Sequence, residues 1–244
     1  MIPGVAGAWR WIRRSGIQCN EKACSDESDQ VKRVIKIITI EREYGSGGGE
    51  IAQLLATHLD WKLWDQLLTE EIARIAHCSK AVVEVREERT DPLYYRLFKS
   101  FLRGSYEGSL NAHKLNVVDS ESILKTTELV VQHAAKKGNS VIVGRGSQHF
   151  LRDREDTLRL FLYAPREAKV RRLLARGKSE SEAEELVDTV DRERIDFIAK
   201  YFGVEWPNLP LYHTMINTSI GDNIVVQLIV SFMKTFDSQL TAVG

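Results

Sequence analysis

Cysteines are scarce in this chain of 244 residues, and none of the three belongs to a C-x-x-C pair. Cys19, Cys24 and Cys78 are an odd set, and His77 beside Cys78 has no partner cluster at metal-ligand spacing. We therefore expect the thiols to be reduced, without a cysteine-based metal site.

Net charge and long apolar runs are absent as well. Lysine plus arginine and aspartate plus glutamate number 34 each, so no overall field favours nucleic acid or an anionic membrane. No stretch has the length and apolarity of a transmembrane helix, and the arginines near Trp9 and Trp11 precede no apolar run of a secretory signal. A cytoplasmic protein without nucleic-acid or membrane partners is expected.

What is present is a regular alternation of apolar strands and helical patterns, which predicts an α/β fold with a mostly parallel sheet covered on both faces. Residues 1–32 lack periodicity and are expected to be a poorly ordered extension before a single domain at 33–244. The expected strands are 34–40, 61–64, 140–143, 158–163 and 213–216. The expected helices are 50–59, 66–76, 121–137, 165–176, 179–200 (one helix or two) and 222–236. Residues 80–118 are rich in charge and aromatics and predict an inserted helical subdomain.

A glycine-rich segment follows the first expected strand. A strand, a glycine turn and a helix N-terminus together aim backbone N–H groups at one point, which is typical of a phosphate-binding loop. The alternative is a tight strand-to-helix connection without a ligand. The candidate nucleotide-binding residues are Arg42, Tyr44, Gly45, Ser46, Gly47, Gly48, Gly49 and Glu50.

This loop lacks the lysine of the pattern G-x-x-x-x-G-K-S/T. If Gly47 is the second glycine of the pattern, Gly48 and Gly49 stand where the lysine and the magnesium-binding hydroxyl belong, and Ser46 is the remaining candidate for magnesium. Losing the lysine's charge costs a rate factor on the order of a thousand unless another cation replaces it. Arg42, or Arg194 and Lys200, are candidates for that cation. Glu50 would repel phosphate unless it turns outward or meets magnesium.

Three segments follow strands and should meet at one edge of the sheet, where open parallel sheets bind ligands. They are Glu41 to Gly49, Asp65, and Gly144-Arg145-Gly146. A phosphate cradle, a carboxylate and an arginine are what phosphoryl transfer needs, because that chemistry depends on positioning and charge neutralisation. We therefore predict that Arg145 is catalytic and binds substrate together with Asp65. The alternative for Arg145 is a surface salt bridge.

A charged helical region beyond this site contains Asp191-Arg192-Glu193-Arg194 and Lys200. It is a candidate lid over a bound nucleotide. Arg192 and Arg194 diverge by about 200 degrees around a helix, so only one of them is expected to face the site. Arg194 and Lys200 are favoured as catalytic residues, with Arg192 the other candidate. An ordinary solvated helix is the alternative.

Several segments carry a resemblance to a known family. The strand before Arg-Glu-Tyr-Gly-Ser-Gly-Gly, then Val-Ile-Val-Gly-Arg-Gly, Phe-Leu-Tyr-Ala-Pro, Asp-Arg-Glu-Arg and Ile-Asn-Thr-Ser occur in the order found in the cytidylate kinase-like family of phosphate-loop proteins, which the chain resembles from about 34 to 236. The resemblance implies a three-layer P-loop NTPase fold with a central five-stranded parallel sheet. It also implies a monophosphate-binding insertion at about 80–118 and a lid at about 177–205.

The same resemblance implies ATP- and magnesium-dependent phosphorylation of a nucleoside monophosphate such as CMP or dCMP. It places Gly45 to Gly49 in the phosphate loop, Asp65 and Arg145 on the acceptor side, and Arg192, Arg194 and Lys200 in the lid. The departures are Arg42 at the first loop glycine, Gly48 at the lysine and Gly144 at an aspartate. A non-catalytic nucleotide sensor and a kinase for another small molecule therefore stay open. The expected partner is the nucleotide substrate, and a homodimer is left open.

Overall fold

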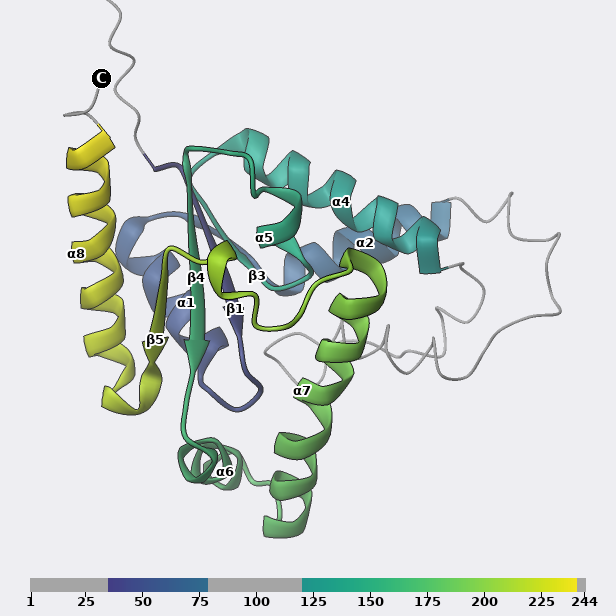
Figure 1. Ribbon diagram of the computed structural model, residues 1–244, viewed down its shortest axis with the longest axis vertical. Helices are drawn as coiled ribbons and strands as arrows, with labels where there is room; N and C mark the ends of the chain where they lie inside the picture. Colours follow the sequence, from purple (N-terminus) through teal and green to yellow (C-terminus); the bar gives the residue numbers. More distant parts are fainter. Residues whose placement is uncertain (1–34, 79–119, 241–244) are drawn as a thin grey trace, which may run out of the picture.

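The computed structural model describes residues 35–78 and 120–240. Within them, five parallel strands form one sheet in the order β2-β3-β1-β4-β5 (Figure 1). This topology confirms the predicted α/β fold with a central five-stranded parallel sheet. The expected N-terminal extension and the expected insertion at 80–118 lie outside the described residues.

The elements follow the expected alternation of strands and helices. The strands are β1 (Ile37–Arg42), β2 (Lys62–Trp64), β3 (Ser140–Val143), β4 (Thr157–Tyr163) and β5 (Thr214–Asn217). The helices are α1 (Gly48–Leu59), α2 (Gln66–Cys78), α4 (Ser120–Lys137), α5 (Ser147–Phe150), α6 (Arg166–Ala175), α7 (Glu180–Phe202) and α8 (Asp222–Leu240), with short 3-10 turns η4 (Leu209–Leu211) and η5 (Thr218–Ile220).

The first strand differs most from its prediction. It begins at Ile37 and continues to Arg42, which pairs with Leu162 of β4. The apolar run ends at Ile40, but ladder hydrogen bonds belong to the backbone and carry the strand through the polar residues Glu41 and Arg42. Arg42 is therefore the last strand residue and not part of the loop.

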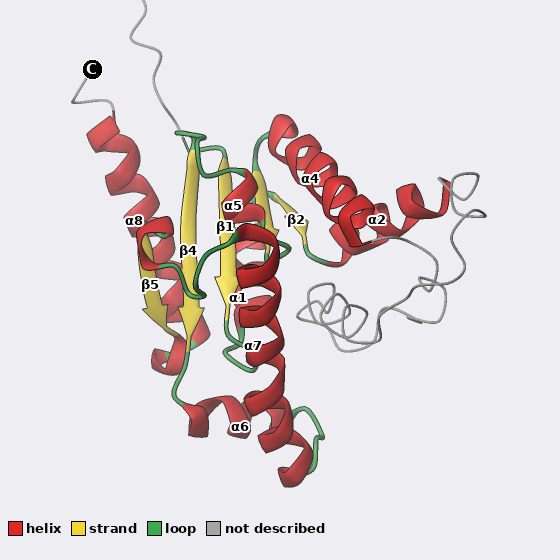
Figure 2. Ribbon diagram, turned by 45° about the vertical axis from the view of Figure 1, so that its right-hand side comes forward, coloured by secondary structure: helices red, strands yellow, loops and turns green. Residues whose placement is uncertain are grey.

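Two layers of helices cover the sheet (Figure 2). Ile38 and Ile40 of β1 pack in one apolar cluster with residues of α1 and α8, whereas Ile37 packs in a second cluster with residues of α2, α4 and α7. Because successive strand side chains point to opposite faces, both faces of β1 are buried. Burial on both faces explains why the strand sequences are nearly continuous apolar runs.

Helix α6 lies beyond the carboxyl end of β4, and α7 runs from there back alongside the sheet (Figure 1). The region expected as one or two helices is the single helix α7, whose first turn is capped by the Ser179 hydroxyl accepting from the Glu182 N–H at 3.2 Å. A third apolar cluster joins Tyr44 of the loop to α6 and α7 through Leu173 and Val187. Helix α7 is thus packed against the glycine-rich loop.

No helix within residues 35–78 and 120–240 combines the length and the apolarity needed to cross a membrane.

A half-buried histidine before β5 is expected to make stability depend on pH. Burial, reinforced by the positive charge of Arg159, lowers the pKa of His213 from 6.5 to about 4. The unfolded chain therefore takes up a proton at a higher pH than the folded chain, and stability is lost as the pH falls from the unfolded pKa towards the folded one. After allowance for solvent screening, we expect His213 to account for a loss of about 1 kcal/mol.

Urea unfolding at about pH 7 and about pH 4.5 measures this loss, with His213→Gln as the variant that lacks the titrating group. The variant should lose less stability than the wild type between the two pH values. An equal loss would assign the proton uptake to other groups.

Candidate phosphate-binding site

The glycine-rich loop joins β1 to α1 in the geometry of an anion cradle. Gly47 is the N-cap of α1 and has a φ of 83°, and Gly45 has a φ of 76°. These left-handed conformations favour glycine, and they direct the chain into the helix so that the N–H groups of its first turn point out of its N-terminus. A Cβ at Gly47 would lie 2.5 Å from Nη1 of Arg172, so glycine also permits a guanidinium to lie over the loop.

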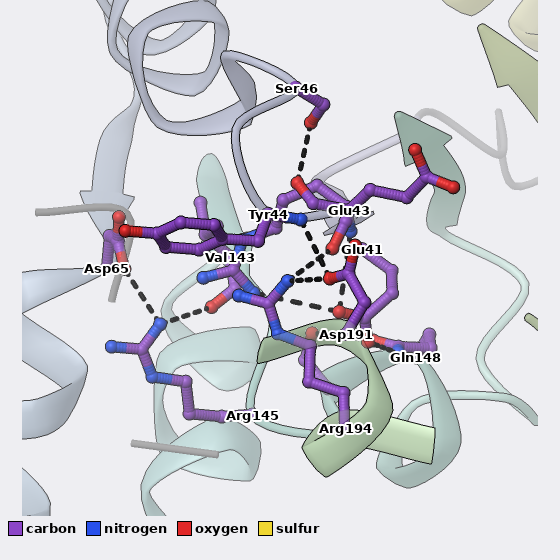
Figure 3. Close-up of polar contacts among 12 residues, drawn as sticks. Glu41, Glu43, Tyr44, Ser46, Asp65, Val143, Arg145, Gln148, Asp191 and Arg194 are labelled. Carbon is purple, nitrogen blue, oxygen red and sulfur yellow. Dashed lines mark hydrogen bonds and ion pairs between the residues drawn. The ribbon is translucent and has the colours of Figure 1, made fainter. Parts of the chain in front are cut away.

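Ser46 and Glu50 each have a polar partner within the protein. The Ser46 hydroxyl donates to the carbonyl of Glu43 at 2.8 Å, on the opposite side of the loop from Arg194 (Figure 3). The Glu50 carboxylate forms an ion pair with Arg176, at the end of α6. Because Arg176 neutralises the charge of Glu50, the repulsion expected between Glu50 and a bound phosphate is reduced.

Asp65 and Arg145 meet as predicted, although β2 and β3 bring them from distant parts of the chain. Arg145 Nη1 donates to Asp65 Oδ1 at 2.8 Å (Figure 3). Its Nη2 donates to Thr69 Oγ1 at 2.6 Å. The Arg145 side chain has 0% exposure, so the alternative of a surface salt bridge is wrong. Arg145 has a φ of 56° between two glycines that also have positive φ, and this turn aims its side chain inward.

Helix α7 contributes Arg194 and Asp191 to the same end of the sheet. Arg194 Nη1 donates to the backbone carbonyl of Arg42 at 3.0 Å and to Asp191 Oδ1 at 2.9 Å. Asp191 Oδ1 also accepts the backbone N–H of Tyr44 at 2.8 Å, so a carboxylate of α7 binds the loop as a bound anion would. Burial raises the pKa of Asp191, while the charge of Arg194 opposes that shift.

Arg192 and Lys200 are exposed, and the structure does not bring them to this cluster. Only Arg194 of the two closely spaced arginines is buried, as the angle between them predicts. Lys200 lies six positions beyond Arg194 and therefore falls about 240 degrees around the helix, with its Nζ 5.3 Å from the centroid of the Tyr201 ring. The buried face of α7 carries Ala183, Val187, Val190, Arg194, Phe197 and Ile198.

Several polar residues of the site were not individually predicted to act there. Lys169 of α6 pairs with Glu43 at 2.9 Å and lies 3.6 Å from Asp191. Glu41 is 4% exposed and accepts from Gln148 of α5. Glu41 lies in the segment Glu41 to Gly49 that was expected at this edge of the sheet, whereas nothing in the pattern of α6 distinguishes Lys169 from its basic neighbours.

A small cavity of about 10 Å³, room for about one water molecule, lies among the arginines of the site. Its lining residues are Glu41, Arg42, Arg145, Gly146, Arg194, Phe197, Ile198 and Trp206. Burial, followed by the charge of Arg194, lowers the pKa of Arg42 to about 10, so its guanidinium stays charged at neutral pH. Three guanidinium groups and one carboxylate line this cavity, a combination that favours an anionic ligand.

No group of three or more histidine, cysteine, aspartate or glutamate side chains in the described part of the chain could hold a metal ion. Magnesium usually binds through one or two carboxylates, waters and substrate phosphates, so a nucleotide site does not require such a group. Glu41 is a buried carboxylate at the cavity and fits that donor set better than Ser46.

The parallel sheet, the glycine loop between β1 and α1, and the converging arginines define a phosphate-loop α/β protein. The chain belongs to the cytidylate kinase-like family, whose family model matches residues 37–220.

Known relatives are similar over parts of the chain. A cytidylate kinase of Methanosarcina mazei is 30% identical over 82 residues, which are 33% of this chain and 46% of that protein. The chain therefore spans less than half of that relative's length. A solved structure of an uncharacterized protein from Eubacterium ventriosum has a TM-score of 0.57 at 21% identity and covers 82% of this chain and 98% of its own, a likeness of fold. A shikimate kinase structure from Bacteroides thetaiotaomicron has a TM-score of 0.47 at 15% identity, covering 82% and 98%.

Proposed function

We propose that the protein is an ATP- and magnesium-dependent kinase that transfers the γ-phosphate of ATP to a nucleoside monophosphate, with CMP and dCMP as the first acceptors to test. The observation that carries this proposal is the convergence of Arg42, Arg145 and Arg194 beside the glycine loop at the carboxyl ends of the strands. Cations arranged in advance around a transferring phosphoryl group are the main means by which such enzymes lower the barrier. Membership of the cytidylate kinase-like family supports the same reaction class.

In this proposal the loop and Arg194 bind ATP, and Arg145 and Asp65 bind the acceptor. Gly45 to Gly49 hold the phosphates of ATP, Arg194 reaches them from α7, and Arg145 with Asp65 lies on the acceptor side. Magnesium enters with ATP, and Glu41, which lines the cavity, is the candidate carboxylate for it.

The test is ADP production from ATP and magnesium against a panel of nucleoside monophosphates, with an acceptor-free control. Acceptor-dependent ADP together with the matching diphosphate product supports the proposal. ATP binding without turnover on any acceptor contradicts it. That result would favour the non-catalytic sensor, which the missing lysine and the contact of Asp191 with the loop also suit, or a kinase for another small molecule.

A further inference from the structure

Arg42 occupies space that two glycines leave open. A Cβ at Gly48, the position of the missing lysine, would lie 2.7 Å from Arg42 Cγ and 2.8 Å from Arg42 Cβ. A Cβ at Gly144 would lie 3.1 Å from Arg42 Cζ and closer still to Nη1. The side chain of Arg42 therefore runs over Gly48 and ends at Gly144. Any larger residue at either position would displace it.

The guanidinium of Arg42 carries a donor that the protein does not use. Arg42 is 5% exposed, yet its Nη2 has no hydrogen-bond partner among the described residues. Its nearest carboxylate contact is loose, with Nη1 lying 3.6 Å from Glu41 Oε1. Leaving a charged donor buried without a partner is costly, so such a group indicates a place for a ligand. The Nε1 of Trp206, which lines the same cavity, is likewise without a partner in the described part of the chain.

The neighbouring cations are committed to other groups. Arg194 donates to a backbone carbonyl and to Asp191, and Lys169 pairs with Glu43. Arg172 donates to Asp222 through Nη1 at 3.1 Å. Arg42, by contrast, keeps a buried Nη2 donor without a partner among the residues described.

We infer that Arg42 supplies the positive charge that the lysine of the phosphate-loop pattern provides elsewhere. In this chain the glycine and the cationic residue of the pattern have exchanged places: Arg42 stands at the first glycine and Gly48 at the lysine. The inference rests on the proposed function and names the residue that contacts the outer phosphates of ATP. The exchange explains why both departures from the pattern occur together. The side chain of an arginine at the first position runs over the residue at the lysine position. It fits there because that residue is glycine and has no Cβ.

The test is to reverse the exchange. Arg42→Gly should lower kcat by about 100- to 1000-fold and weaken binding of ATP and of inorganic tripolyphosphate, with little effect on AMP. Arg42→Met, which keeps apolar bulk but no charge, should behave alike. Gly48→Lys alone should also impair the protein, because its Cβ meets Arg42. The double variant Arg42→Gly/Gly48→Lys should recover at least tenfold of the binding and the rate lost in Arg42→Gly, because it restores the glycine and the lysine of the pattern.

Binding and turnover are read separately, with circular dichroism to show that each variant is folded. An active wild type with unaffected Arg42→Gly and Arg42→Met variants overturns the inference and leaves the proposed function standing. Arg42-dependent ATP binding without turnover on any acceptor overturns the proposed function and supports the inference. A double variant no better than Arg42→Gly would make Arg42 a structural residue. A wild type that binds neither ATP nor tripolyphosphate at millimolar concentration overturns both.

Discussion

Asp65→Ala is expected to lower the free energy of unfolding by about 3–5 kcal/mol, because it leaves the Arg145 guanidinium buried without its counterion. The Arg145 side chain has 0% exposure, and its Nη1 forms an ion pair with Asp65 Oδ1 at 2.8 Å. Arg145 also donates to two neutral groups, the hydroxyl of Thr69 and the carbonyl of Val143. Urea unfolding followed by circular dichroism measures the loss.

Two further variants separate the charge effect from simple truncation. Asp65→Ala combined with Arg145→Met removes both charges and should recover much of the stability, because an apolar pair of similar volume often replaces a buried ion pair without loss. Asp188→Ala breaks the exposed pair with Arg166 and should leave the unfolding midpoint unchanged. A loss for Asp65→Ala as small as that of Asp188→Ala would show that neutral partners suffice for Arg145.

Arg194→Ala is expected to lower kcat about 100- to 1000-fold under the proposed function, a loss typical of removing one charged or hydrogen-bonding group from a transition state. Arg194 reaches the end of β1 from α7 and lines the cavity with Arg42 and Arg145. Arg192→Ala is the matched control, because it removes the same side chain two positions away on the exposed face and should change kcat by less than about twofold. Steady-state kinetics with ATP and the best acceptor of the panel compares the two variants.

The distribution of the loss between rate and affinity identifies the role of Arg194. A fall in kcat that exceeds any weakening of ATP binding indicates a charge that acts in the transition state. Equal losses would make Arg194 a binding residue that holds α7 over the nucleotide. Similar effects of Arg192→Ala and Arg194→Ala would contradict the placement of Arg194 at the site, and thermal unfolding of both variants guards against loss of structure.

Local patterns in the sequence determined the elements of this fold and their order. Periodicity of apolar residues located all five strands to within three residues at each end, because strands buried on both faces leave apolar runs that are hard to mistake. The glycines after β1 and around Arg145 indicated a common edge of the sheet, since carboxyl ends of parallel strands meet there. Helical geometry was enough to separate Arg192 from Arg194. Family motifs in order pointed to the family that the family model confirms.

Only the tertiary structure decided which side chains complete the site. The bond from Arg194 to the carbonyl of Arg42 joins residues 152 positions apart, and the contact of Asp191 with Tyr44 joins residues 147 apart. Such contacts depend on how α7 packs over the sheet, which local periodicity does not encode. The path of Arg42 over Gly48 to Gly144 is likewise a matter of packing between three elements. The sequence by itself showed that the lysine was missing, and the three-dimensional arrangement placed a buried arginine beside its position.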